Sequence, residues 1–431
     1  MPHRGYLFVT ARGHKLSLIS REVNLLLLHF FLHLFMGWGI FAPRMNIILF
    51  DNEKRQSLFP LTFTCAIADL RTGILTIKER WETLSSRNFF IHTEEYLQPL
   101  YKPVPAGKNL WVDASVMADK ALVNEILALD EGIAFDDELG FIAGVLETDP
   151  AEFDPGKALA SFNIKHHLKN VRRLKYPWEI FQWNDQYIKE DFELLTYHQK
   201  SQPHPSSNHY INETDIFIEE GAEINFSSLN ASGGPIYIGK NALVMEGSLI
   251  RGPFALCEGS VIKMGAKVYG ATTVGPYCTA AGEIKNSVMQ AYSNKGHDGY
   301  LGDAVIGKWC NLGAGTSNSN VKNNGTDVEM WSYDANDYIP VGSKGGLIMG
   351  DYSRTAINTS LNTGTVMGVC CNIFDAGLLP KYISNFTWGG KDFNPYEFEK
   401  ALRDIANWKK MKHQTLNDEE KAILKHIFES F

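Results

Sequence analysis

The sequence predicts an α/β domain, followed by a parallel β-helix and then by a pair of C-terminal helices. Three observations lead to this fold class. Apolar residues recur every six positions in the middle of the chain. Before them, short apolar runs alternate with amphipathic stretches, and after them two stripes with helical spacing follow. At 431 residues the chain is long enough for two or three such domains.

The six-residue repeat is the evidence for the β-helix. An α-helix places apolar residues three and four apart, and a half-buried strand places them two apart. A strict spacing of six, with glycines between, is typical of hexapeptide coils in which each short strand turns a corner and stacks on the preceding coil. The residues predicted to face inward are Ile238, Val244, Ile250, Leu256, Ile262, Val268 and Val274.

The charge balance and the cysteine content limit the kinds of function that the chain can have. The chain carries 41 basic and 49 acidic residues, a formal net charge of −8, which argues against a general nucleic-acid binder but not against a local basic pocket for phosphates. The six cysteines show no CxxC spacing, so we expect small buried residues of a reduced, cytoplasmic protein.

The first 44 residues differ from the rest. A basic stretch precedes the apolar run Val23–Ala42, which has roughly the length of a membrane span. Met45 then opens a good first strand. We prefer the interpretation that the functional protein begins at Met45 and that residues 1–44 are a non-native or unstructured extension. A membrane anchor and a signal peptide remain the alternatives.

Residues 45–197 are expected to form the α/β domain, with a mainly parallel, Rossmann-like sheet. The predicted strands include Asn46–Phe50, Leu110–Val112 and Phe141–Val145. Two further helices are expected at Ala121–Leu129 and Trp183–Tyr197. Between the first two strands an apolar stripe predicts a helix, with Leu70, Ile74, Ile77, Trp81 and Leu84 on one face.

The remaining boundaries follow from composition. Residues 198–215 are polar and contain two prolines, which predicts a linker. The β-helix is expected at 216–390, interrupted by a protruding loop at Asn323–Gly345. Helices are predicted at 391–431, with Phe398, Leu402, Ile405 and Trp408 as one apolar stripe. Asn417 and Glu420 form a possible capping box for the last helix.

The residues that could carry chemistry gather between Glu283 and Asn320. Stacked coils bring residues one coil apart into contact, so these groups can converge. His297 has a side chain suited to general base catalysis near neutral pH. Glu283 could orient it, and Lys285 could hold a phosphate. The alternative for Glu283 and Lys285 is a solvated outer face, and for His297 a structural role at a coil corner.

The motifs E-x-K-N-S from Glu283, G-H-x-x-Y-L-G-D from Gly296 and N-L-G-A-G-T from Asn311 resemble the acetyltransferase half of the GlmU-like bifunctional family. The resemblance implies a left-handed β-helix and an α/β domain of the nucleotidyltransferase type. It also implies acetyl transfer from acetyl-CoA to an amino-sugar 1-phosphate, followed by nucleotidyl transfer, as in UDP-N-acetylglucosamine synthesis.

The same resemblance implies roles for individual residues. His297 would be the base that takes a proton from the attacking amino group, and Glu283 would polarise it. Lys285 would bind the sugar phosphate. The other implied positions are Tyr300 and Asn311 near the developing oxyanion, Ala314 beside acetyl-CoA through its backbone, and Asn320 at sugar and cofactor. Val321 stands where the family has a tyrosine, which leaves the acceptor uncertain.

The first domain departs further from the family. The glycine-rich phosphate loop expected after strand one is absent, and Asp51 and Glu53 stand there instead. Arg55 keeps its place in the motif, and Lys54 or Arg71 could replace the missing positive charge. Asp113 stands where the family has a magnesium ligand, which is reasonable chemistry for Mg²⁺. The alternative is that Asp113 only ends a strand.

The leading hypothesis is therefore a GlmU-like transferase that uses acetyl-CoA and, in its first half, Mg²⁺ and a nucleoside triphosphate. The alternatives are a nucleotidyltransferase using UTP or dTTP with the β-helix as a trimer scaffold, and a non-catalytic sugar-nucleotide-binding protein. The resemblance implies a homotrimer with acetyl-CoA sites between subunits. We expect no nucleic-acid partner and no membrane association.

Overall fold

A computed structural model describes residues 45–375, 377–389 and 392–431. Asn46–Phe431 forms one compact unit. The predicted extension at 1–44, with its apolar run Val23–Ala42, lies outside the described residues. Within the described ranges no helix is both long and apolar enough to cross a membrane.

The α/β half is built on a six-stranded mixed sheet in the order β2-β1-β3-β5-β4-β6. Neighbours β1–β2, β1–β3 and β4–β6 are parallel, whereas β5 is antiparallel to both β3 and β4. Five of the six strands therefore run in the same direction, which confirms the prediction of a mainly parallel sheet. Only β5 runs against them, because a tight hairpin joins it to β4. The strands are β1 Asn46–Phe50, β2 Phe90–His92, β3 Gly107–Asp113, β4 Ile133–Asp137, β5 Gly140–Thr148 and β6 Ile164–His167.

Helices flank this sheet. The stripe predicted to start at Leu70 becomes helical only at Ile77, because Thr76 and Glu79 form a capping box there. Leu70 and Ile74 are nonetheless buried. The helices are α2 Ile77–Ser85, α3 Lys120–Leu127, α4 Pro155–Ala158 and α5 Glu179–Thr196. Short 3-10 turns are η1 Arg55–Leu58, η2 Ile67–Asp69, η3 Gln98–Leu100, η4 Pro150–Glu152, η5 Leu159–Ser161, η6 Glu213–Asp215 and η7 Ala231–Gly233.

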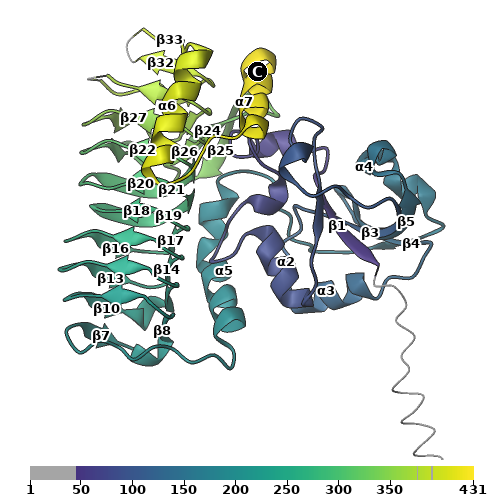
Figure 1. The fold of residues 1–431 in the computed structure, drawn as a ribbon, viewed down its shortest axis with the longest axis horizontal. Coiled ribbons are helices and arrows are strands. Elements are labelled where there is room, and N and C mark those ends of the chain that lie inside the picture. The colour runs from purple at the N-terminus through teal and green to yellow at the C-terminus, as the bar shows by residue number, and fades with distance from the viewer. Residues whose placement is uncertain (1–44, 376, 390–391) are drawn as a thin grey trace, which may run out of the picture. The chain divides into compact units, whose positions relative to one another are not determined.

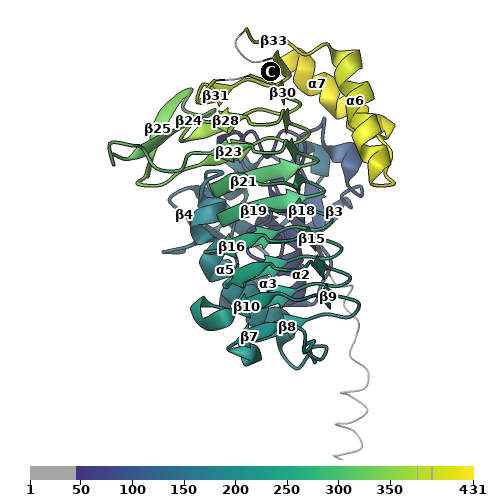
Figure 2. The ribbon, with the colours of Figure 1, turned by 90° about the vertical axis from the view of Figure 1, so that its left-hand side faces the viewer.

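The second half is a left-handed parallel β-helix with three faces (Figures 1 and 2). The long strands β19 and β21 turn from the first face onto the second. Their bounds are β19 Glu283–Ala291 and β21 Tyr300–Lys308. The first face consists of β7 His209–Ile211, β10 Ser228–Asn230, β13 Leu249–Arg251, β16 Lys267–Tyr269, the starts of β19 and β21, β23 Ser317–Asn318 and β28 Ser360–Leu361.

The other two faces are also parallel ladders. The second face holds β8 Ile216–Ile218, β11 Ile236–Ile238, β14 Phe254–Leu256, β17 Thr272–Val274, the ends of β19 and β21, β26 Leu347–Met349, β29 Thr365–Met367 and β31 Tyr382–Ile383. The third holds β9 Glu223–Ile224, β12 Leu243–Val244, β15 Val261–Ile262, β18 Thr279–Ala280, β20 Asn294–Lys295, β22 Asn311–Leu312, β27 Arg354–Thr355, β30 Asn372–Ile373, β32 Thr387–Gly389 and the edge strand β33 Asn394–Pro395.

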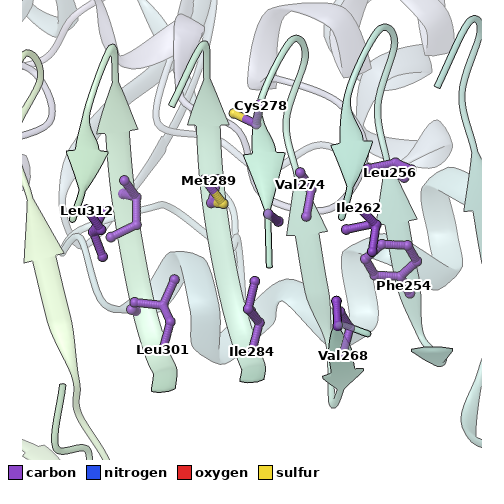
Figure 3. Close-up of a cluster of buried hydrophobic side chains, with 14 of the residues drawn as sticks. Phe254, Leu256, Ile262, Val268, Val274, Cys278, Ile284, Met289, Leu301 and Leu312 are labelled. Carbon is purple, nitrogen blue, oxygen red and sulfur yellow. The ribbon is translucent and has the colours of Figure 1, made fainter. Parts of the chain in front are cut away.

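The six-residue repeat fills the interior as the sequence predicted. Ile262, Val268 and Val274 are almost completely buried and point into one continuous core (Figure 3). The six cysteines are free and buried, which confirms their prediction as small buried residues. The ladder begins earlier than expected, because β7 pairs with β10 from within the predicted linker 198–215.

The α/β half packs on the second face of the β-helix, with α5 against it (Figure 1). The buried Asn184 amide donates to the Ala271 carbonyl at 2.9 Å and accepts from the Gly73 amide at 2.7 Å. The Gln290 side chain exchanges two hydrogen bonds with the backbone of Arg71, at 2.8 and 3.0 Å. These buried hydrogen bonds join the two halves, and the first face stays outside this contact.

The interruption predicted at Asn323–Gly345 is an antiparallel hairpin of β24 Val328–Ser332 and β25 Asp337–Gly342. Its Tyr333 ring meets Phe63 edge-on at 5.5 Å, and Trp331 stacks on Tyr382 at 4.6 Å. The C-terminal helices are α6 Phe398–Met411 and α7 Asp418–Ser430, and the capping box of Asn417 and Glu420 is confirmed.

The interior repeat gives a direct stability test. Replacing Ile262 with Ala should lower the free energy of unfolding by about 2–5 kcal/mol, because it removes buried methyl groups and leaves a cavity. Met264, two residues further on, is exposed, so Met264→Ala should change the free energy of unfolding little. Urea titration of both variants measures the difference. Equal stabilities would contradict the inward orientation of the repeat.

Candidate functional site

The first face brings together three of the predicted site residues. Strand register places Glu283 directly beside Tyr300, and Lys285 beside Gly302 two positions on. On the other side, Lys267 lies beside Glu283, and Tyr269 beside Lys285. Alternation along a strand sends Glu283 and Lys285 to the same outer side. The result is a polar surface of five side chains contributed by β16, β19 and β21, of which Lys267 is exposed and the other four are half-buried.

Glu283 is hydrogen-bonded within this surface. Its carboxylate accepts from the Tyr269 hydroxyl at 2.6 Å. That bond, together with burial, raises the pKa of Tyr269 to about 12. The Lys285 ammonium lies 5.7 Å from the centre of the Tyr269 ring, a cation–π arrangement. Tyr269 and Lys267 are not among the residues predicted from the sequence, although Lys267 stands one coil before Glu283 and Tyr269 one coil before Lys285.

A second set of polar contacts closes the upper edge of this surface. The Asn320 amide donates to the Tyr300 hydroxyl at 3.1 Å and to the Asp303 carboxylate. Asn286 donates to the other oxygen of the buried Asp303 at 2.6 Å. Asn286 and Asp303 both have left-handed backbone, with φ of 46° and 47°, at corners of neighbouring coils. The structure therefore brings Asn320 to Tyr300 and adds Asp303 as the residue that holds the Asn320 amide.

His297 occupies the corner between β20 and β21, just before Tyr300. Its side chain is exposed. Ala314 lies at the equivalent corner of the next coil, where the Gly315 amide donates to the Asp298 carbonyl at 2.9 Å. No hydrogen bond or ion pair joins Glu283 to His297 in the described part of the chain. The proposed polarising contact between them is thus not formed in the structure.

Asn311 lies on a different face from Glu283 and Tyr300. It begins β22 on the third face, in register with Asn294 on one side and Arg354 on the other. A single chain therefore places Asn311 on one side of the prism and the Glu283 surface on another. The motifs did not show this separation, because they lie close together in the sequence and do not state which face of the β-helix each residue occupies.

In the α/β half, the two arginines proposed as phosphate ligands are buried. Arg55 forms an ion pair with Asp51 at 3.0 Å and also donates to the carbonyl of Thr62 and to the Tyr96 hydroxyl. Arg71 pairs with Glu79 at 3.2 Å and donates to the Ile74 carbonyl. Both guanidinium groups are engaged inside the protein, and the structure does not bring them together at one pocket.

Asp113 has a cation of its own. The Arg173 guanidinium forms an ion pair with the Asp113 carboxylate at 2.8 Å. The same carboxylate accepts hydrogen bonds from the Asn52 side-chain amide and from the backbone amide and hydroxyl of Ser115. The same guanidinium binds Asp137 through two hydrogen bonds, at 2.7 and 2.9 Å. Burial raises the pKa of Asp113, and the Arg173 charge opposes that shift.

These contacts do not fit a magnesium ion at Asp113. A divalent cation there would lie against the positive charge of Arg173, and the donors already surround both carboxylate oxygens. Among residues 45–375, 377–389 and 392–431, no group of three or more His, Cys, Asp or Glu side chains is arranged to hold a metal. The alternative interpretation, that Asp113 ends β3, describes its position in the sheet.

A cavity of about 840 Å³ lies where β1 and β2 end, the usual ligand position in an open α/β sheet. Burial raises the pKa of Asp51, at its inner edge, to about 6. Carboxylates dominate the charged lining and would repel a triphosphate. The acidic lining residues are Asp51, Glu53, Glu94, Glu95 and Asp149.

Comparison with known proteins gives independent information. Residues 47–200 match a family model described as sugar nucleotidyl transferase. The chain is 27% identical over 166 residues to the bifunctional protein GlmU of Synechococcus elongatus, covering 36% of this chain and 32% of that protein. It is 36% identical over 107 residues to GlmU of Bordetella parapertussis, covering 25% of this chain and 19% of that protein. These matches confirm the resemblance to GlmU-like proteins.

The matches are partial. They span about a third or less of the relatives' own length. A solved structure, the polySia-specific acetyltransferase NeuO, has 12% sequence identity and a TM-score of 0.24 over 44% of this chain and 81% of that one.

The Arg173 cluster gives the second stability test. Arg173→Met leaves two buried carboxylates without their cation and should lower the free energy of unfolding by about 3–5 kcal/mol in urea titration. Adding Asp113→Asn and Asp137→Asn should recover much of the loss, because no charge is then left buried. Lys108→Met is the control, since its ion pair with Glu131 is exposed.

A metal titration completes that test. Wild-type protein titrated with Mn²⁺ should show no binding that depends on Asp113. Binding that is present in the wild type and lost in Asp113→Asn would contradict the assignment of Arg173 as the cation of this cluster.

Proposed function

We propose that the β-helix transfers an acetyl group from acetyl-CoA to the amino group of an amino-sugar 1-phosphate. The observation that carries the proposal is the first-face surface, where Lys285, Glu283 and Tyr300 lie side by side next to the corner of His297. It combines a cation for a phosphate, hydrogen-bonding groups for a sugar and an exposed imidazole. The similarity to GlmU-like proteins supports the same chemistry.

The proposed reaction follows from these groups. The acceptor nitrogen attacks the thioester carbonyl carbon, while the His297 imidazole takes a proton from that nitrogen. Hydrogen-bond donors, the Tyr300 hydroxyl and the Asn311 amide of a neighbouring copy, stabilise the oxyanion that forms. The carbon–sulfur bond then breaks, and the leaving CoA thiolate takes the proton from His297. The products are the N-acetylated sugar phosphate and free CoA.

Binding roles complete the proposal. Lys285 would hold the sugar phosphate, and the cation–π contact of its ammonium with the Tyr269 ring supports this position. Asn320, held by Asp303, presents its amide beside Tyr300 for the sugar. The backbone at Ala314 is one coil from His297 and would contact acetyl-CoA. Glu283 accepts the hydrogen bond of the Tyr269 hydroxyl and would thereby keep Tyr269 in position beside Lys285, where the phosphate would bind.

Replacing His297 with Ala should lower acetyl transfer by about 100-fold or more, because a general base contributes on that scale. The assay is release of free CoA from acetyl-CoA with glucosamine 1-phosphate. His209→Ala is the control, since His209 is an exposed histidine on the first strand of the same face. Equal CoA release by wild type and His297→Ala would exclude this role, and no release by the wild type would exclude this acceptor.

We also propose that the working form is a homotrimer whose sites lie between subunits. The resemblance implies this assembly, and the position of Asn311 on a different face from Glu283 supports it. A neighbouring copy would supply the Asn311 face to the Glu283 surface. A protein that sediments as a monomer at micromolar concentration would contradict the proposal.

Mixed assemblies test the shared site. Glu283→Gln and Asn311→Ala chains should each be weak alone, and subunits that are unfolded together and refolded should regain part of the activity, since some sites then combine two intact faces. Refolding each variant separately before mixing is the control. Failure of the co-refolded mixture to exceed the average of the two variants would show that the two residues serve the same chain's site or none.

A second candidate function belongs to the α/β half. The match of residues 47–200 to sugar nucleotidyl transferases, together with the cavity at the ends of β1 and β2, favours nucleotidyl transfer to a sugar 1-phosphate. The acidic lining and the Arg173 cluster favour ligand binding without turnover. Pyrophosphate release from UTP or dTTP with a panel of sugar phosphates separates the two, and binding without release would identify a sugar-nucleotide-binding domain.

A further inference from the structure

Lys295 is a lysine inside the β-helix. It ends β20 with its side chain directed into the core, and none of its surface is exposed. Its register neighbour on the preceding coil is Ala280. The inward positions of the same face on other coils are mostly apolar, and they are Ile224, Val244, Ile262, Ala280, Leu312, Thr355 and Ile373.

The Lys295 ammonium turns back toward the corner that carries His297. It donates a 2.6 Å hydrogen bond to the His297 carbonyl and makes a longer contact of 3.5 Å with the Ala281 carbonyl. Within the described ranges it has no ion pair with a carboxylate. Burial lowers the pKa of Lys295 to about 8, against the opposing influence of Asp298. Burying a cation without hydrogen-bond partners raises the free energy of the folded state. The two carbonyl contacts of the Lys295 ammonium therefore stabilise the folded chain.

The coil below makes room for this lysine. Only Ala281 and Gly282 separate β18 from β19, whereas four residues separate β20 from β21 at the same corner. Ala280 leaves space for the lysine stem. At Gly282, with φ of +75°, a Cβ atom would come within 3.0 Å of the His297 carbonyl oxygen. The short corner and the small residues thus allow the His297 corner to settle onto the lysine.

Two hydrogen bonds then fix the corner from opposite sides. The Lys295 ammonium holds the His297 carbonyl from inside, and the Gly315 amide holds the Asp298 carbonyl from the next coil. With its backbone held in this way, the His297 side chain is exposed at the corner before β21. A lysine that served packing alone would need no such hydrogen bond, because an apolar side chain fills the same position on neighbouring coils.

We propose that Lys295 is a positioning residue that holds the corner of His297 in its working geometry from inside the β-helix. This inference rests on the proposed role of His297 as the base. Lys295 would contribute by keeping the His297 imidazole oriented toward the acceptor nitrogen. This matters because a small displacement of a catalytic group lowers the reaction rate strongly.

The test replaces the ammonium and keeps the stem. In Lys295→Met, amide hydrogen exchange at residues 296–299 should rise by about ten-fold, since local opening becomes easier. The kcat for acetyl transfer should fall by about ten-fold or more, with the KM values for both substrates nearly unchanged, because the lost interaction acts on geometry in the transition state. Lys295→Gln keeps a shorter donor and should fall between wild type and Lys295→Met in both measurements.

Ile373→Val is the matched control, since it alters the same interior column away from this corner. It should leave exchange at 296–299 and the kcat unchanged. Unchanged exchange in both Lys295 variants, or a kcat loss equal to that of Ile373→Val, would overturn the proposal. If Lys295→Met does not fold, the Lys295→Gln comparison decides by the same criteria.

The exchange measurement separates this inference from the proposed function, because it needs no turnover. A wild-type protein that releases no CoA, with exchange that rises in Lys295→Met, would reject acetyl transfer and the catalytic part of the inference while retaining the hold of Lys295 on the corner. If the wild type is active but amide exchange in Lys295→Met is unchanged, the result would reject only the proposal that Lys295 holds the His297 corner.

Discussion

Register between stacked coils is the constraint on which the rest of the structure depends. Parallel strands lie about 4.8 Å apart, so a side chain always meets its equivalent on the next coil. This pairing places Glu283 beside Tyr300 and Lys285 beside Tyr269. It also holds the interior apolar residues in continuous columns. A surface assembled from neighbouring coils is therefore as rigid as the core beneath it.

Chemistry gathers where that register is disturbed. The coil that ends at Gly282 is short at one corner, and the next coil carries Lys295 and His297 there. After Asn320 the chain leaves the coil for the β24–β25 hairpin and returns at Gly345, whose amide donates to the Asn320 carbonyl at 3.0 Å. Regular coils offer repeating surfaces, whereas a missing or inserted segment creates a distinct local shape.

The two halves use their cations differently. In the α/β half, Arg55, Arg71 and Arg173 are buried and paired with acidic residues of the protein itself. Such pairs are costly to break and leave little charge for a ligand. On the first face of the β-helix, Lys285 and His297 remain accessible. The contrast leaves positive charge available to a ligand on the β-helix, whereas Arg55 and Arg71 are already paired inside the α/β half and do not supply the charge of a glycine-rich phosphate loop.

The sequence by itself determined the features that depend on short-range spacing. The six-residue repeat gave the β-helix and its core, and the pattern at Asn417 gave a capping box. The resemblance of the motifs also singled out Glu283, Lys285 and Tyr300, which lie on the neighbouring strands β19 and β21. Only the tertiary structure decided the partners of charged groups. Asp113 and Arg173 are 60 positions apart, and nothing local indicates that they pair. The antiparallel β5, the place of Asn311 on another face and the inward turn of Lys295 likewise depend on how the chain folds back on itself, which spacing alone does not encode.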